Sequence, residues 1–110
     1  MKTLRQGDVV TALLFKDKPR PGVVARANRY CDGENITLCP ITSTLAGGPI
    51  RVRVAPGQSG LEMTSEILPY RITTLPAQRV VAHLGRLSSA EIRALDAVLR
   101  DWLGIPLDGG

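Results

Sequence analysis

Short apolar stretches separated by turn residues fill the first three quarters of the chain. Runs rich in β-branched and apolar residues predict strands at 9–15, 22–26 and 36–39. Residues 50–54 alternate with a period of two, which predicts a half-exposed strand with two arginines on one face. Two further strands are expected at 65–74 and 78–84, where Pro69 and Pro76 limit them to edges or bends.

The turn between the second and third strands sets the expected positions of the two cysteines. Asp32-Gly33 is typical of a two-residue hairpin turn, and paired residues across it would sum to 65. Cys39 would then face Arg26 and not Cys31, so a disulfide is not expected and both cysteines are interpreted as reduced thiols. With one histidine in the chain, these cysteines also lack the partners for a zinc site.

The pattern changes to helical spacing after residue 87. Ser88 followed three residues later by Glu91 is a capping box, and Gly104 with Pro106 predicts where the helix ends. The apolar positions between them are Ile92, Leu95, Val98, Leu99, Trp102 and Leu103. This stripe must cover a sheet or a partner, and burial in the core is the simplest interpretation of Trp102.

Five or six short strands followed by one helix predict a mainly β fold, a small SH3-like β-barrel with a C-terminal helix. The 110 residues fit a single domain, 1–110, with 108–110 expected to be a frayed tail. No apolar run reaches the ~18 residues of a membrane span, and nothing at the N-terminus is typical of a signal peptide. We therefore expect a cytoplasmic protein with no membrane partner.

Charge is the first hint of a partner. Fourteen Lys and Arg against ten Asp and Glu give +4, and residues 1–30 hold seven basic against two acidic residues, a net of +5. Such a cluster suits a polyanion or an acidic protein partner, although it also suits a merely soluble basic surface. The four aromatic residues are few for a platform that stacks single-stranded bases.

Two polar segments interrupt the apolar strands, and common catalytic signatures are missing. There is no phosphate-binding loop, zinc-protease helix or serine nucleophile elbow. His83, the one histidine, could act as a general acid or base, but its apolar stretch favours a packed or rim histidine. Arg20 lies between Pro19 and Pro21, which restrict the backbone that carries its guanidinium. Residues 40–44, Pro-Ile-Thr-Ser-Thr, place three hydroxyls at a strand exit, where they could also cap their own backbone.

These segments resemble the MazF/PemK family of bacterial toxins. Residues 7–10 (Gly-Asp-Val-Val) are similar to the start of the family's first strand, 20–24 (Arg-Pro-Gly-Val-Val) to its second strand, and 40–43 (Pro-Ile-Thr-Ser) to the end of its third. Residues 72–75 with 78–80 resemble its late strand and following turn. Residues 84–88 and 103–105 resemble its C-terminal layout, so the resemblance covers nearly the whole chain.

The resemblance implies the toxin of a type II toxin–antitoxin system, a metal-independent and sequence-specific endoribonuclease that needs no cofactor. Its substrate would be single-stranded RNA, cleaved by attack of the 2′-OH. The family's catalytic Arg and Thr correspond to Arg20 and Thr42 here. We expect five further residues to bind RNA: Lys16, Lys18, Arg26, Ser43 and Arg71.

The resemblance also implies partners. It predicts a homodimer in the bacterial cytoplasm and a cognate antitoxin, whose acidic disordered segment would suit the basic N-terminal third. Two alternatives remain open. One is a toxin of the same fold that poisons DNA gyrase, as the related CcdB toxins do with a Trp-Gly-Ile C-terminus faintly similar to residues 102–105. The other is a non-catalytic SH3-like binding module.

Overall fold

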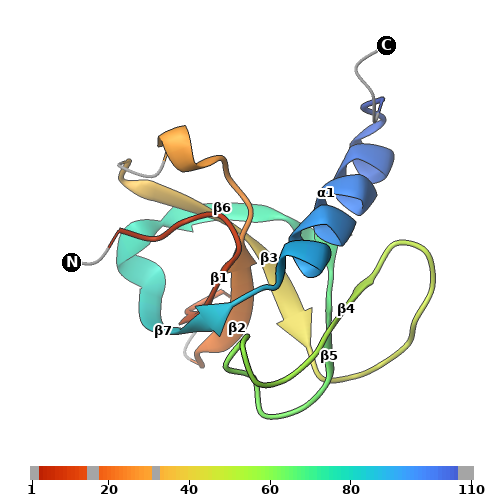
Figure 1. The fold of residues 1–110 in the computed structure, drawn as a ribbon. Coiled ribbons are helices and arrows are strands. Elements are labelled where there is room, and N and C mark those ends of the chain that lie inside the picture. Colours follow the sequence, from red (N-terminus) through yellow and green to blue (C-terminus); the bar gives the residue numbers. More distant parts are fainter. Residues whose placement is uncertain (1–2, 15–17, 31–32, 107–110) are drawn as a thin grey trace.

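The computed structural model describes residues 3–14, 18–30 and 33–106, and its secondary structure is mainly β (Figure 1). The strands are β1 (Asp8–Ala12), β2 (Arg20–Val24), β3 (Asn35–Thr42), β4 (Val52–Val54), β5 (Ser65–Ile67), β6 (Thr73–Pro76) and β7 (Val80–Arg86). The helices are the 3₁₀ turns η1 (Asn28–Tyr30), η2 (Pro69–Arg71) and η3 (Ala77–Arg79) and the α-helix α1 (Ser89–Leu103). The expected mainly β fold with one C-terminal helix is therefore confirmed, although the described residues form seven strands where five or six were expected.

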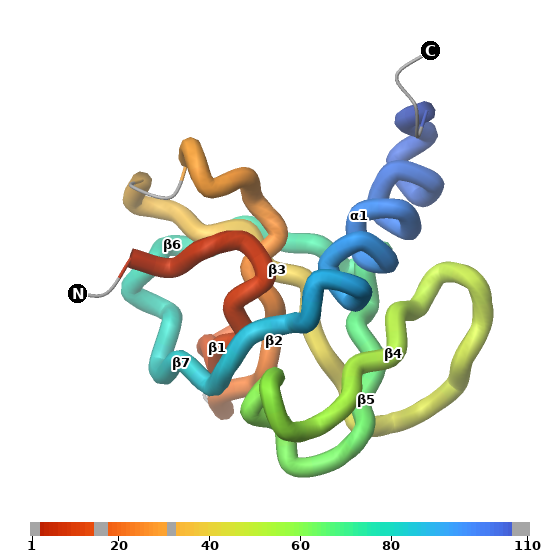
Figure 2. Tube along the Cα trace, viewed as in Figure 1, coloured from red at the N-terminus to blue at the C-terminus, as the bar shows by residue number. Residues whose placement is uncertain are grey.

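The strands form one antiparallel sheet in the order β4-β5-β3-β2-β1-β7, with β6 pairing separately with β3. The sheet curves into a half-barrel, and the long loop between β3 and β4 makes a wide excursion beside β4 and β5 (Figure 2). Residues of the central strands alternate between two apolar clusters. Val9, Val23 and Cys39 belong to one cluster, whereas Val10 and Val24 belong to the other. Because both faces are covered, these strands appear in the sequence as continuous apolar runs.

The helix α1 packs on β4 and η2 and covers the first cluster through Leu95. Its N-terminus has the predicted capping box: Ser88 Oγ accepts from Glu91 N at 3.1 Å, and Glu91 Oε1 accepts from Ser88 N at 2.8 Å. Glu91 Oε2 also accepts from Ala55 N at 3.0 Å, which ties the helix start to the end of β4. Gly104 ends the helix in the left-handed region, as its position predicts.

The predicted hairpin register is wrong. The observed pairs of β2 and β3 sum to 62, so Cys39 lies opposite Val23 and not Arg26. The connection is longer than a two-residue turn, since β2 ends at Val24, β3 begins at Asn35 and η1 lies between them. Cys39 is fully buried, and burial raises the pKa of its thiol to about 12, so it stays protonated. Cys31 and Asp32 lie outside the described residues.

Two other expectations need correction. The strand expected at 65–74 is two strands, because Pro69 begins η2 between β5 and β6. Trp102 is not in the core, because it is 50% exposed. Its ring packs against the ring of Tyr70, and the two ring centroids are 5.9 Å apart. The last turns of α1 extend past the half-barrel, so the end of the apolar stripe has no sheet beneath it (Figure 1).

None of the helices formed by the described residues is long and apolar enough to span a membrane. The described residues also hold no group of three or more His, Cys, Asp or Glu side chains that could bind a metal ion.

Candidate active site

The pairing of β2 with β3 brings the two candidate catalytic residues level with each other. Gly22 of β2 pairs with Pro40 of β3, and Arg20 and Thr42 each lie two residues beyond this pair in the same direction. Arg20 also pairs with Ala12 of β1. Two residues that are 22 positions apart in the chain therefore lie at the same end of neighbouring strands.

Arg20 and Thr42 line one open pocket of about 350 Å³. Ser43 and Thr44 line it as well, so the pocket brings one arginine together with three successive hydroxyl-bearing residues at the end of β3. Its other wall comes from the segment before β5, with Leu61, Glu62, Met63 and Ser65. A cation and hydroxyl donors around a solvent-open pocket are suited to the oxygens of a phosphate group.

The two key side chains are held differently. Thr42 Oγ1 accepts a hydrogen bond from Thr44 N at 3.1 Å, which fixes the oxygen while leaving the hydroxyl hydrogen available to donate. Arg20 is exposed, and within the described part of the chain no hydrogen bond or ion pair engages its guanidinium. Its donors are thus available to a ligand.

The structure does not gather all the other predicted RNA-binding residues in this pocket. Ser43 lies in it, and exposed Lys18 precedes Arg20 by two positions. Arg71 lies on η2 and lines a separate pocket with Tyr70 and Leu14. Arg26 follows the opposite end of β2, where its Nε donates to Tyr30 O at 3.1 Å. Lys16 lies outside the described residues.

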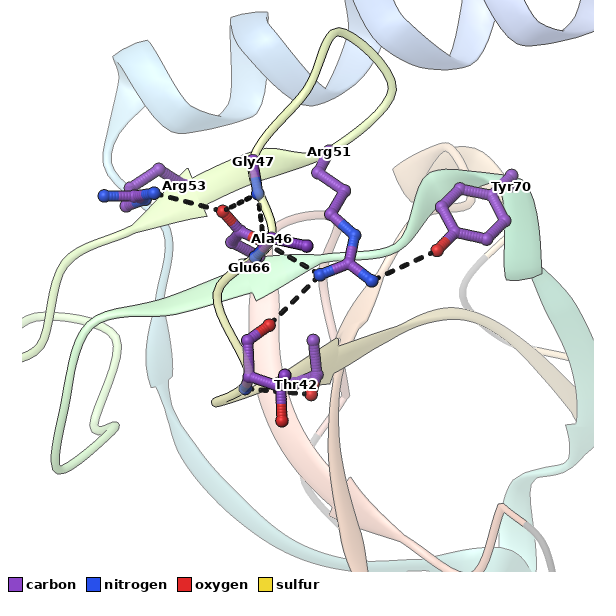
Figure 3. Close-up of polar contacts among 8 residues, drawn as sticks. Thr42, Ala46, Gly47, Arg51, Arg53, Glu66 and Tyr70 are labelled. Atoms are coloured by element: carbon purple, nitrogen blue, oxygen red, sulfur yellow. Dashed lines mark hydrogen bonds and ion pairs between the residues drawn. The ribbon is translucent and has the colours of Figure 1, made fainter.

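A buried carboxylate lies on the strand that pairs with the end of β3. Glu66 of β5 is the cross-strand partner of Thr42 and is only 2% exposed (Figure 3). Its oxygens accept from Ala46 N at 2.9 Å, from Gly47 N at 3.0 and 3.2 Å, from Arg51 Nη1 at 2.9 Å and from Arg53 Nη2 at 3.1 Å.

Arg51 extends this cluster toward the hydroxyls. Its Nη1 also donates to Thr44 O at 3.1 Å, and its Nη2 donates to Tyr70 Oη at 3.4 Å. Hydrogen bonds from Ala46 N, Arg51, Gly47 N and Arg53 lower the pKa of Glu66 from an ordinary 4.5 to about 2, although burial opposes this. The hydrogen bond to Glu66 is the main cause that raises the pKa of Arg51. Both groups are charged at neutral pH.

Sequence reasoning missed this cluster and the carboxylate of Glu62. The alternation of residues 50–54 placed Arg51 and Arg53 on one face, which is observed, because both reach Glu66. The available signal was the lone carboxylate within the apolar segment Glu66-Ile67-Leu68, since a buried charge requires a partner. Nothing local indicated that the partners would be those two arginines.

The fold and the pocket define a class: a small antiparallel half-barrel with one C-terminal helix, and a pocket of one arginine and several hydroxyls at the strand ends. Residues 5–103 match the family model of the PemK-like, MazF-like toxins of type II toxin–antitoxin systems. The chain belongs to this family, as its motifs predicted.

Individual relatives agree with that placement. The chain is 29% identical over 107 residues to the probable endoribonuclease MazF of Mycolicibacterium smegmatis, which covers 93% of this chain and 98% of the relative. Its fold is similar to an endoribonuclease in complex with its cognate antitoxin from a mycobacterial species, with a TM-score of 0.82, 22% identity and coverage of 94% and 97%. It is also similar to the Mycobacterium tuberculosis toxin MazF-mt6, with a TM-score of 0.81, 24% identity and coverage of 90% and 98%.

Proposed function

We propose that this protein is the toxin of a type II toxin–antitoxin system and acts as a sequence-specific, metal-independent endoribonuclease on single-stranded RNA. The observation that carries the proposal is the joint lining of one pocket by Arg20 and Thr42. A non-catalytic module would have no need to bring these two side chains together. The family and the relative named as a probable endoribonuclease support the same activity.

The reaction we propose uses the substrate's own nucleophile. The 2′-oxygen of a ribose forms a bond to the adjacent phosphorus as the bond from phosphorus to the 5′-oxygen breaks. The 2′-OH loses its proton and the leaving 5′-oxygen gains one, which gives a cyclic phosphate and a 5′-OH end. Negative charge builds on the non-bridging phosphate oxygens, and stabilising it is the main task of the site.

Arg20 and Thr42 have complementary roles in this scheme. The Arg20 guanidinium presents several donors in a plane to the phosphate oxygens and carries the positive charge they need. It does not act as the base, because its pKa exceeds ~12. The hydroxyl of Thr42, whose oxygen is fixed by Thr44 N, donates a hydrogen bond to the phosphate or orients the 2′-OH.

The proposed partners are a second copy of the chain and an antitoxin that binds the basic surface near the pocket. We propose that the protein works as a homodimer in the bacterial cytoplasm, and that an antitoxin inhibits it through an acidic, disordered segment. One similar structure is described as an endoribonuclease with its cognate antitoxin. Charge attraction between such a segment and the cations near the pocket would compete with RNA directly. Cleavage that persists with saturating antitoxin bound would contradict this assignment.

Metal-free cleavage of RNA tests the proposal. A long single-stranded RNA is incubated with the protein in EDTA, beside Arg20→Ala and Thr42→Ala, and the new ends are mapped. Wild-type protein should cut at a short repeated sequence, and each variant should lose about 100-fold or more in rate, the loss typical for one stabilising donor. Arg93→Ala, which removes an exposed arginine from α1, is the matched control and should cut normally.

Trp102 is half exposed and could therefore contact a partner, so the gyrase-poison alternative can be tested at this residue. If folded wild-type protein leaves RNA intact, a gyrase cleavage assay with wild type and Trp102→Ala follows. Gyrase-dependent DNA breaks that Trp102→Ala abolishes would replace the ribonuclease assignment. Intact RNA together with intact DNA would favour the binding module.

A further inference from the structure

We propose that Glu66 is a positioning residue of the candidate active site: it holds the loop 43–47 so that the Thr42 hydroxyl is oriented for the reaction. This inference rests on the proposed function. Among the described residues no hydrogen bond or ion pair joins Glu66 to the side chain of Arg20 or Thr42, so it would act through the residues it binds.

The first step of the argument is the unusual number of donors that converge on one buried carboxylate. Two backbone N–H groups of the loop and two guanidinium groups donate to it (Figure 3). Charge-assisted hydrogen bonds of this kind are stronger than neutral ones, and they are strongest where water is excluded. Glu66 is only 2% exposed, so the arrangement has little freedom.

The second step is the path from Glu66 to the hydroxyl. Glu66 holds Arg51 Nη1, and the same nitrogen donates to Thr44 O. Thr44 N in turn donates to Thr42 Oγ1. The orientation of the Thr42 hydroxyl therefore depends on the backbone of Thr44, which Glu66 holds through Arg51 on one side and through Ala46 and Gly47 on the other.

The third step is the need for such a clamp. The segment between β3 and β4 has no strand pairing of its own, and it carries Gly47 and Gly48 with φ of +70° and +100°. Glycine at these positions permits the turn but leaves the free chain many conformations. Without a clamp, Ser43 and Thr44 would not stay at one wall of the pocket.

Glu66→Gln tests the proposal because it preserves the shape of the side chain while removing its charge and one of its two acceptor oxygens. A carboxamide has one acceptor oxygen and turns its own N–H groups toward the surrounding donors. Misplacement of a catalytic group by about 1 Å can cost 100-fold in rate. We therefore expect kcat for RNA cleavage to fall about 10-fold to 100-fold with KM changed less than about threefold, since Arg20 and Lys18 still bind the phosphates.

Amide hydrogen exchange gives a second readout that a general loss of stability would not reproduce. In Glu66→Gln, protection should fall at the amides of Ala46 and Gly47 while β1 and β7 keep theirs. Glu34→Gln removes a carboxylate just before the other end of β3 and is the matched control, with unchanged rate and exchange. Should Glu66→Gln fail to fold, Arg51→Lys decides. The guanidinium of Arg51 uses two nitrogens to reach Glu66, Thr44 O and Tyr70 Oη, and the single nitrogen of a lysine cannot reproduce that arrangement, so the same losses of kcat and of protection are expected.

A Glu66→Gln protein with wild-type kcat would overturn the proposal, and so would a loss that resides in KM. Unchanged protection at Ala46 and Gly47 would also overturn it. Wild-type protein that cleaves no RNA would refute the proposed function instead. The exchange measurement would then still decide whether Glu66 holds the loop.

Discussion

Glu66 is the residue on which pH should act most clearly. Its carboxyl has a pKa of about 2 in the folded chain against an ordinary 4.5. A group whose folded pKa is lowered stabilises the fold when charged, so its contribution is full above about pH 4.5 and disappears as the pH falls toward 2.

The prediction is that wild-type protein exceeds Glu66→Gln in free energy of unfolding at pH 6, and that this difference shrinks steadily between pH 4.5 and 2. Urea unfolding of both proteins at several pH values measures it. A difference that stays constant down to pH 2 would contradict the low pKa.

At this scale local motifs in the sequence picked out two residues that the fold brings together, but not the side chains around them. Arg20 and Thr42 lie in recognisable local motifs, and the structure places both at one pocket. The partners of Glu66 could not be predicted, because Arg51 lies just before β4 and Arg53 within it, and the backbone donors come from the loop before it. Trp102 was misjudged because helical spacing defines a face without showing how far the covering sheet extends.

At the scale of elements, the loop that follows β4 packs closely on β7. Gln58 O accepts from Arg86 N at 3.0 Å, and Gln58 Nε2 donates to Leu87 O at 3.2 Å. Gly60 has a φ of +78°, and a Cβ there would collide with the backbone of Leu84. The contact therefore depends on the absence of a side chain at Gly60.

Gly60→Ala and Gly57→Ala separate backbone strain from collision. Gly57 also has a positive φ, +93°, but a Cβ there would meet nothing within 4 Å. Gly57→Ala should cost about 1–2 kcal/mol of unfolding free energy, the strain of a left-handed alanine. Gly60→Ala should cost a further 1–3 kcal/mol, roughly, for the collision. Urea unfolding compares them, and equal losses would show that the loop yields easily.

Elements with local signals were predicted well, and pairing was not. The start and end of α1 follow from Ser88, Glu91 and Gly104, all of which act within a few residues of the helix ends. The register of β2 and β3 depends on the whole connection between Val24 and Asn35. A two-residue turn at Asp32-Gly33 was a local interpretation of a connection that includes η1.

At the scale of the whole molecule, the excess of positive charge should make the affinity for a polyanion depend on salt. Lys18 and Arg20 are exposed at the pocket end of β2, whereas Arg93 is exposed on α1. Affinity for single-stranded RNA falls with salt by a slope of about −0.7 per phosphate neutralised. An acidic antitoxin segment that uses the same cations should show a similar dependence.

We predict that Lys18→Ala reduces the magnitude of this slope by about 0.7, whereas Arg93→Ala leaves it unchanged. Fluorescence anisotropy of a labelled RNA measures the affinity at salt concentrations from about 50 to about 300 mM, a range over which the screening length falls. The Thr42→Ala background prevents cleavage during the titration. Equal slopes for Lys18→Ala and its parent would place the RNA away from this end of β2.

The pairing of β1 with β7 has a consequence for how the protein folds during its synthesis on the ribosome. Asp8 and Arg86, joined by a 2.9 Å ion pair, are 78 residues apart in the chain. During translation Arg20 and Thr42 emerge early, but the central strand β1 has a partner on one side only until β7 has followed. The sheet cannot be complete before β7 has left the ribosome, and contacts between residues so far apart in the chain also form slowly. This protein therefore completes its sheet only after residues 80–86 have been translated.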